Sequence, residues 1–346
     1  MRRILLLLTI LSVLVIPVNA KALTMPSVPQ SAKKFMPENQ SNFAEGLWEV
    51  LRDALASIRP DLEEAASVCG RIVAVMVLVS LLQSFPGASK NTVALAGNIG
   101  IALILFRSTG SLVNLAVTTV AEISEYGKLL LPVMTTAMAG QGRVSTSAAL
   151  YAGTALFDAL LTALIGKLLT PVVYIFLVLA VACSAVSEDV LKNLRNNVKW
   201  IISWSLKTIL YIYTGYISIT GVVSGTTDAA ALKAAKLTIS SVVPVVGSIL
   251  SDASEAVLVS AGSLKNAAGI YGLFAIIAIW IQPFLKIGIH YLLLKATGAV
   301  SSIFSCKSST ELMQDFSSAL ALLLAMTGTI SLLLLISLVC FLRGGG

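Results

Sequence analysis

The feature that most constrains this chain is a series of long apolar runs that recur along almost its whole length. A helix needs about 20 predominantly apolar residues to cross the hydrocarbon of a bilayer. Hydrophobic residues make up 57% of the chain and charged residues only 12%, and a soluble fold of 346 residues could not hide that much apolar surface. The sequence therefore predicts an all-α, polytopic membrane helix bundle. The clear runs lie at approximately 65–85, 92–110, 148–166, 168–187, 200–223, 267–282, 284–304 and 317–342.

A further, doubtful crossing covers about 112–139, where glycine and proline interrupt the apolar sequence. Lys192, Arg195 and Lys199 lie in the most basic short loop, which the positive-inside rule places in the cytoplasm. With an external N-terminus, an odd number of crossings must precede this loop, and the doubtful segment supplies the odd one. The crossings that follow then leave Arg343 inside. We predict about seven to nine spans, some of them short or broken.

The first 20 residues have the pattern of a secretory signal peptide. Arg2 and Arg3 form a basic start, an apolar run follows at 4–16, and small residues lead up to Ala20. An apolar core of about 13 residues is shorter than a spanning helix needs. We predict a signal peptide at 1–20 that is cleaved after Ala20, and the alternative is an uncleaved first helix.

Residues 21–64 form a polar segment, predicted to be extracytoplasmic, before the membrane domain at 65–346. Apolar residues recur at helical spacing from Phe43 to Ile58, which predicts an amphipathic helix. Such a helix lies on the membrane or on a partner. The alternative is a solvated helix that folds back on its own loops.

The segment 224–266 interrupts the series of apolar runs. Its VPVVG core is short, and Pro244 removes a backbone donor. Asp252 can then cap a new helix, with Glu255 as its capping-box partner. Irregular backbone at membrane depth is tolerated only where protein or a water-filled cavity surrounds it. Two interpretations stay open, a re-entrant, pore-lining hairpin and an extracytoplasmic helix pair that lies on the surface.

Ionisable residues inside the apolar runs are a second candidate feature, because a charge in hydrocarbon costs at least about 2.5 kcal/mol at the midplane. Asp158 lies near the middle of its run, and Lys207 lies about two turns into the next one. The lysines can instead snorkel to the interface, and a lone histidine can be a hydrogen-bonded structural residue. The candidate pore-lining or partner-contact residues are Asp158, Lys207, Pro244, Gly247, Asp252, Glu255, Lys265, Asn266, Lys286 and His290.

The sequence gives little support to enzyme chemistry. It has one histidine, no CxxC spacing and no GK(S/T) phosphate-binding ending, so we predict no catalytic residues, no metal site and no cofactor. The four isolated cysteines are typical of packing residues. The net charge of +7 is spread between the apolar runs rather than gathered on one face, which argues against nucleic-acid binding.

The stretch 214–272 has a distinctive order of elements. A turn with Gly221 and Ser224 precedes an Ala-rich helix, and the VPVVG element is followed by Ser251 and Asp252. This stretch resembles the most distinctive part of stage III sporulation protein AE of endospore-forming bacteria. The likeness extends over nearly the whole chain and is specific at 214–304.

The resemblance implies a noncatalytic integral-membrane subunit of the secretion-type feeding channel between mother cell and forespore. The implied partners are a secretion-type ATPase, small membrane subunits and ring-forming proteins. The implied location is the mother-cell membrane that surrounds the forespore. An autonomous transporter or permease, with its substrate near broken helices, is the alternative.

Overall fold

The structure is a computed structural model in which every regular element of the described residues is a helix, which confirms the all-α prediction. The predicted signal peptide at 1–20 lies outside the described residues and stays a prediction. The side chains of 221–265 are also outside the description. The backbone is described for residues 25–38, 43–86, 89–186, 188–242, 247–301 and 307–343.

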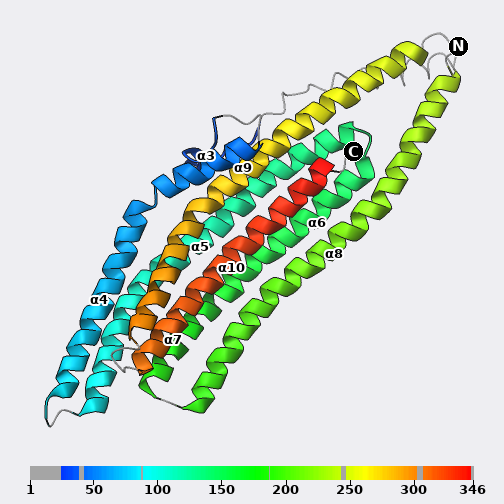
Figure 1. Ribbon diagram of the computed structural model, residues 1–346. Helices are drawn as coiled ribbons and strands as arrows, with labels where there is room; N and C mark the ends of the chain where they lie inside the picture. The colour runs from blue at the N-terminus through cyan, green and yellow to red at the C-terminus, as the bar shows by residue number, and fades with distance from the viewer. Residues whose placement is uncertain are drawn as a thin grey trace.

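Long helical segments run antiparallel along one axis and form an elongated bundle (Figure 1). The α6 helix continues through the π-helical turn η1 directly into α7, so these three elements make one segment. The elements in chain order are α2 (Gln30–Lys33), α3 (Phe43–Ala56), α4 (Arg59–Ser84), α5 (Lys90–Gly140), α6 (Val144–Ala163), η1 (Leu164–Leu169), α7 (Thr170–Ala185), α8 (Asp189–Val242), α9 (Gly247–Ser301) and α10 (Lys307–Arg343).

The core of the bundle is built around α10, which packs on α5, α6, α7, α8 and α9. Its side chains Leu312, Phe316 and Ile330 are fully buried. A helix that is apolar on all sides is stable in the core of a bundle or in the hydrocarbon of a membrane. Glycines bring neighbouring helices close, since Gly153 lies against the ring of Tyr216 in α8.

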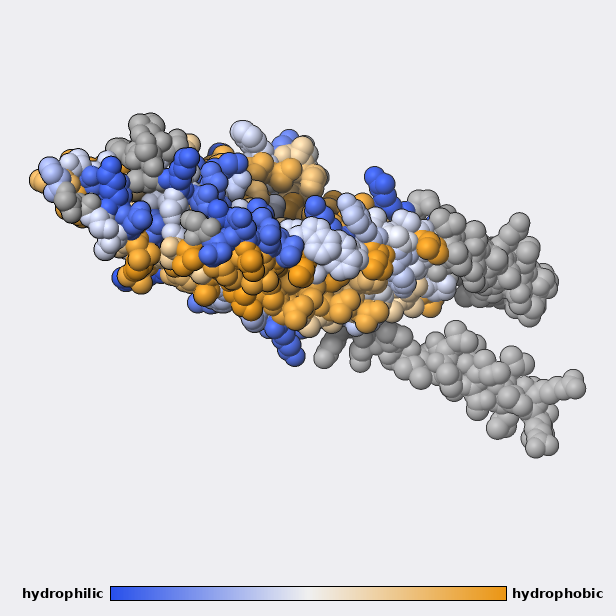
Figure 2. Space-filling view, turned by 90° about the horizontal axis from the view of Figure 1, so that it is seen from below, coloured by the Kyte–Doolittle hydropathy of each residue, from blue (hydrophilic) through white to orange (hydrophobic). Residues whose placement is uncertain are grey.

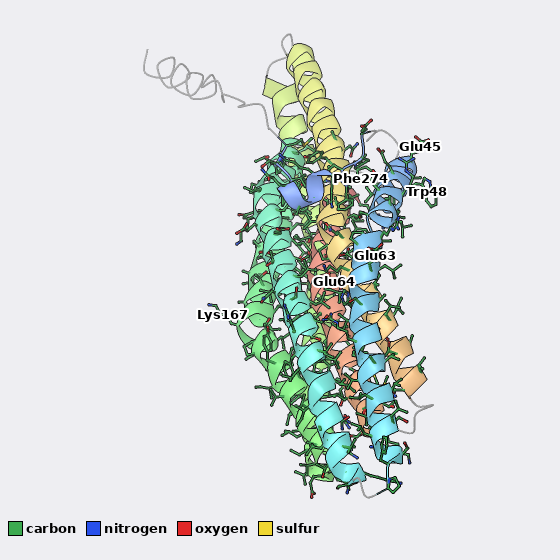
Figure 3. The ribbon with its side chains drawn as sticks, turned by 90° about the vertical axis from the view of Figure 1, so that its left-hand side faces the viewer. Glu45, Trp48, Glu63, Glu64, Lys167 and Phe274 are labelled. Atoms are coloured by element: carbon green, nitrogen blue, oxygen red, sulfur yellow. The ribbon has the colours of Figure 1, made fainter. Side chains whose placement is uncertain are left out.

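The helix α3 confirms the amphipathic pattern predicted from Phe43 to Ile58. Val50 and Ala54 are buried, and the ring of Phe43 stacks on Phe274 of α9 with ring centroids 5.3 Å apart. Trp48, on the opposite face, is 68% exposed and points away from the bundle (Figure 3). The helix therefore folds back onto the bundle with one face and keeps the other face free.

Three pairs of predicted spans are single continuous segments, which is a correction to the sequence analysis. The runs at 92–110 and 112–139 are both in α5, those at 148–166 and 168–187 are both in α6–α7, and α9 passes through Pro283 without ending. An internal proline costs a helix one backbone hydrogen bond, but packing against neighbours can hold the helix together. Before Pro171 the chain adopts the π-helical turn η1, at whose end the backbone N–H of Thr170 donates to the carbonyl oxygen of Ile165.

The predicted count of about seven to nine spans is therefore not confirmed. In the described part of the chain, the structure has 5 helical segments that are long and apolar enough to cross a membrane. The run at 200–223 lies in α8, which is not one of them. The segments that qualify are Arg59–Ser84, Lys90–Gly140, Val144–Ala185, Asn266–Ser301 and Lys307–Arg343.

The fused segments also change the expected position of the C-terminus. An odd number of segments, α4, α5 and α6–α7, still precedes the basic start of α8. Because α8, α9 and α10 follow, the C-terminus lies at the end of the bundle opposite to the start of α8 (Figure 1). Arg343 therefore lies at the other end of the bundle from Lys192 and Arg195, and the prediction that these residues share one side of the membrane stays unconfirmed.

The segment 224–266 consists of two helical arms over its described backbone. The end of α8 and the beginning of α9 extend past the ends of the other helices (Figure 1). Pro244 lies outside the described residues, and Gly247 is the first residue of α9. Whether this hairpin enters a membrane stays a prediction.

The surface of the bundle carries broad apolar areas. Figure 2 shows a hydrophobic area along the bundle beside a band of hydrophilic residues. Large exposed hydrophobic side chains include Leu81 on α4, Leu103 on α5 and Ile175 on α7. A contiguous apolar surface of this kind needs lipid or protein to cover it.

Candidate functional site

An ion-pair cluster joins the beginning of α4 to the middle of α9. The Nζ atom of Lys286 lies 3.1 Å from a carboxylate oxygen of Asp61 and 2.7 Å from one of Glu64. The Asp61 side chain is only 13% exposed. Both acids lie in the first two turns of α4, where the helix dipole favours negative charge. The lysine therefore holds two acidic side chains that would otherwise repel each other.

His290 lies one helical turn after Lys286 and extends the cluster into the bundle. Its Nδ1 atom is 2.9 Å from the backbone carbonyl oxygen of Lys286, and the residue is 5% exposed. Its Nε2 atom is buried and has no hydrogen-bond partner among the described residues. In a neutral ring with Nδ1–H as donor, Nε2 is left as an acceptor. The same ring borders a small cavity with Cys69 and Thr109.

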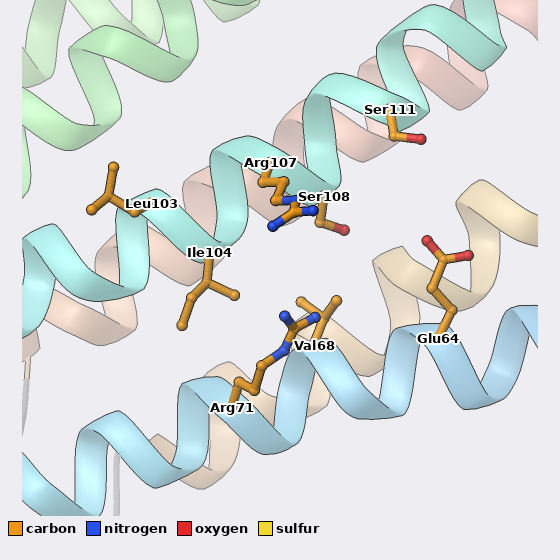
Figure 4. Close-up of a pocket in the computed structure, with 8 residues that line it drawn as sticks. All are labelled: Glu64, Val68, Arg71, Leu103, Ile104, Arg107, Ser108 and Ser111. Atoms are coloured by element: carbon orange, nitrogen blue, oxygen red, sulfur yellow. The ribbon is translucent and has the colours of Figure 1, made fainter.

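A cavity of about 620 Å³ opens between α4 and α5 next to this cluster (Figure 4). Arg71 on α4 and Arg107 on α5 point toward each other across it (Figure 4). The remaining lining residues are Glu64, Val68, Leu103, Ile104, Ser108 and Ser111.

A second cavity of about 260 Å³ lies beside the first and shares Ser111 with it. Asp61 and Lys286 line it together with Gln282 and Glu122. We call the lining of the two cavities, together with His290, the polar seam. It follows the contacts between α4, α5 and α9.

The N-terminal segment closes part of the polar seam. The Oγ of Ser31, in α2, donates a hydrogen bond of 3.0 Å to a carboxylate oxygen of Glu122 on α5. Ser31 also lines the second cavity. This contact ties the segment that precedes the membrane domain to the seam.

Among the predicted site residues whose side chains the structure describes, it brings together only Lys286 and His290. Asp158 lies elsewhere, buried between α5 and α6, where it accepts a 2.6 Å hydrogen bond from the Oγ of Ser124. Its other carboxylate oxygen has no partner among the described residues. Lys207 is exposed on α8, far along the chain from the seam.

The other predicted site residues lie on the arm of α9 or beyond the description. Asn266 is exposed on α9. The backbone of Asp252, Glu255 and Lys265 is helical, but their side chains are outside the described part. Their proposed roles stay predictions.

Sequence reasoning missed five charged residues of the polar seam. Asp61 and Glu64 were grouped with the polar N-terminal segment, although their spacing of three residues places them on one helix face. Arg71 and Arg107 interrupt apolar runs, which is a signal that could have found them. Only the fold, however, shows that the two arginines share a cavity. The five residues are Asp61, Glu64, Arg71, Arg107 and Glu122.

Other buried polar contacts fix the helices to one another. The side-chain amide of Asn98 donates a hydrogen bond of 3.1 Å to the carbonyl oxygen of Ser184. Arg195 forms an ion pair with Asp315, with 2.6 Å between the nitrogen and oxygen atoms. Thr154 of α6 lies 3.1 Å from the hydroxyl of Tyr213 in α8. Interhelical hydrogen bonds of this kind hold membrane helices in register.

The side chains of the polar seam are suited to binding ions and to pairing with charged groups. In the described ranges, no group of three or more His, Cys, Asp or Glu side chains is arranged to hold a metal ion. The seam offers guanidinium groups, carboxylates and hydroxyls at the side of the bundle. These groups can bind a charged ligand or a charged partner.

Comparisons with known proteins identify the family to which the chain belongs. The family model described as "Stage III sporulation protein AE" matches residues 30–345. A relative, Stage III sporulation protein AE of Bacillus subtilis (strain 168), is 24% identical over 272 residues, which are 78% of this chain and 68% of the relative. No solved structure matches the chain. Because the family model covers nearly the whole sequence, the chain belongs to the stage III sporulation protein AE family.

Proposed function

We propose that this chain is a noncatalytic integral-membrane subunit of the complex that crosses the envelope between mother cell and forespore during endospore development. Family membership supports the role in sporulation. The observation that carries the subunit role is the length of the helices. The 51 residues of α5 extend about 77 Å, whereas the hydrocarbon core of a bilayer is about 30 Å thick. Much of the bundle would therefore stand outside the membrane, where other proteins can bind it.

The proposed partners are a secretion-type ATPase, small membrane subunits and ring-forming proteins, and the proposed location is the mother-cell membrane around the forespore. The arms of α8 and α9 support this proposal because they extend past the other helices (Figure 1). A pair of helices that protrudes from a bundle has few intramolecular contacts of its own. We expect the arms, at 224–266, to contact neighbouring subunits.

The alternative is an autonomous transporter or permease. Transporters of this kind bind their substrates near the bilayer midplane, between broken helices. Pro132 and Pro283 are the residues at which such breaks would be expected, but α5 and α9 continue through them. The packing of the bundle favours the subunit, since α10 fills its middle and both cavities of the polar seam lie at its side.

The test is copurification from gently solubilised sporulating cells. The tagged chain should carry the ATPase and the ring-forming proteins with it. A variant that lacks 228–241 and 248–261 shortens both arms by about four turns each. It should reach the membrane at the normal level but lose these neighbours. A control, Asn197→Ala, changes an exposed residue of α8 within the bundle and should keep them.

Two results would contradict the proposal. One is a chain that purifies without any of these neighbours under conditions that preserve the complex. The other is a purified chain that transports a solute by itself after reconstitution into vesicles. The second result would establish the transporter alternative.

A further inference from the structure

The cavity between α4 and α5 holds two guanidinium groups that the rest of the described chain does not neutralise. Arg71 and Arg107 are both exposed and point toward each other (Figure 4). Among the described residues neither forms an ion pair, and Arg71 donates its Nε–H only to the carbonyl oxygen of Ser67, at 3.3 Å. Glu64, the one acid among the lining residues of this cavity, is held by Lys286 at 2.7 Å. The cavity is therefore cationic.

Two facing guanidinium groups repel each other, and an anion between them removes that repulsion. The planar fork of arginine binds phosphate or carboxylate oxygens with two parallel hydrogen bonds. Ser108 and Ser111 line the same cavity and add hydroxyl donors. The volume of about 620 Å³ lies within the ordinary range of ligand sites. The site is thus suited to a phosphate group.

The surroundings of the arginines indicate which kind of phosphate. Arg71 and Arg107 each end a stretch without charged residues, at 72–89 and 91–106. The α4–α5 hairpin beyond them exposes large apolar side chains, whereas the other side of the cavity is bordered by the ion-pair cluster of Asp61, Glu64 and Lys286. Arginines at such a boundary lie at the level of lipid headgroups. The exposed apolar side chains of the hairpin are Val77, Leu78, Leu81, Leu82, Phe85, Leu95, Ile99 and Leu103.

We propose that the cleft between Arg71 and Arg107 binds the phosphate of an anionic phospholipid. The phosphate lies between the two guanidinium groups, and the acyl chains follow the apolar surface of the α4–α5 hairpin. A free phosphate ion would use the arginines but leave this apolar surface uncovered. An acidic protein segment would likewise not match it. The proposal does not depend on membership of the sporulation complex.

The test is a lipid titration of the purified full-length chain in detergent, with bound lipid counted by native mass spectrometry. We expect phosphatidylglycerol to bind more tightly than zwitterionic phosphatidylcholine. The Arg71→Gln/Arg107→Gln variant should bind phosphatidylglycerol about tenfold more weakly and lose the preference, because it lacks the charge-assisted hydrogen bonds. The Arg71→Lys/Arg107→Lys variant keeps the charge but not the fork and should keep part of the preference.

The matched control is Arg52→Gln/Arg59→Gln, which removes the same two charges from exposed positions on α3 and at the start of α4. It should bind phosphatidylglycerol like the parent chain. Circular dichroism and elution volume check that each variant is folded. If Arg71→Gln/Arg107→Gln does not fold, Arg107→Gln alone is used, since Arg107 has no ion pair among the described residues.

Four outcomes would overturn the proposal. The parent chain could bind the two lipids equally, or the variant at positions 71 and 107 could keep the preference. The control could also lose the preference as fully, which would mean that net charge and not the cleft attracts the lipid. Inorganic phosphate and soluble glycerophosphoglycerol distinguish the sources of the phosphate. If either displaces phosphatidylglycerol at millimolar concentration or below, the site is one for a soluble phosphate.

Discussion

Lys286 is the residue on which the contacts of the polar seam converge. It pairs with Asp61 and Glu64 through its ammonium group and with the ring of His290 through its carbonyl oxygen. A partly buried ion pair contributes little net stability when both partners are present. Loss of one partner is costly, because the remaining charge is left without compensation. The lysine pairs with two neighbouring acids, so its loss should lower the stability of the fold.

We therefore expect Lys286→Met to lower the free energy of unfolding by about 2 kcal/mol. The measurement is unfolding of the purified chain in detergent. Lys207→Met is the matched control, because Lys207 is exposed and has no ion pair in the described part of the chain; it should change stability by no more than about 0.5 kcal/mol. Asp61→Asn combined with Lys286→Met should recover part of the loss. Equal stability of the two single lysine variants would show that the ion pair has no such role.

At the scale of elements, whether a long helix is unbroken decides how many times the chain can cross a membrane. The α5 helix runs through Gly110 and Pro132 without turning back, although both residues resemble breaks in the sequence. A glycine inside a helix costs about 1 kcal/mol relative to alanine, and neighbours can supply that amount. The side chain of Thr136 donates to the carbonyl oxygen of Pro132, at 3.0 Å. Packing against α10, α9 and α6 holds the rest of the helix.

Spin labels at positions 95 and 136 test this continuity. In one α-helix the two positions are about 62 Å apart, whereas two antiparallel crossings would bring them within about 20 Å of each other. The measurement is pulsed electron paramagnetic resonance on a variant without native cysteines. Labels at 95 and 110 serve as the control, with an expected separation of about 22 Å in either case. A distance of about 20 Å between positions 95 and 136 would show that α5 is not continuous and would support the two separate spans predicted from the sequence.

At the scale of the whole molecule, the order of the segments fixes which loops share an end of the bundle. The start of α8 and the start of α10 lie at one end, and the arms of α8 and α9 extend at the other (Figure 1). Lys192, Arg195 and Lys199 favour the cytoplasmic side for the first of these ends. The arms would then stand on the extracytoplasmic side. This arrangement agrees with the predicted external N-terminus.

Cysteine accessibility checks this sidedness in intact, non-sporulating cells that express the chain in their outer cytoplasmic membrane. In a variant without native cysteines, Asn193→Cys and Lys307→Cys should both be protected from a membrane-impermeant maleimide until the cells are permeabilised. Asp252→Cys should react without permeabilisation. Labelling of positions 193 and 307 from different faces would contradict the order of segments. Protection of position 252 from both faces would leave the proposed role of the arms in partner binding without support.

The sequence by itself determined the class of this protein and the nature of its elements. Apolar runs and a low share of charged residues depend only on local composition, so they predicted helices in a membrane, and the spacing from Phe43 predicted α3. The signal peptide and the character of the VPVVG element rest on the sequence alone and stay predictions.

Only the tertiary structure decided which of these elements are continuous and which charges meet. Gly110 and Pro283 allow either a turn or an unbroken helix, and packing by neighbouring helices selects the second. Lys286 and Glu64 are 222 residues apart in sequence, so no local pattern pairs them. Arg71 and Arg107 face each other only because α4 and α5 pack as a hairpin (Figure 4). The physical reason is the same in each case, since interactions between distant segments outweigh local preference when they bury or pair groups that water would otherwise solvate.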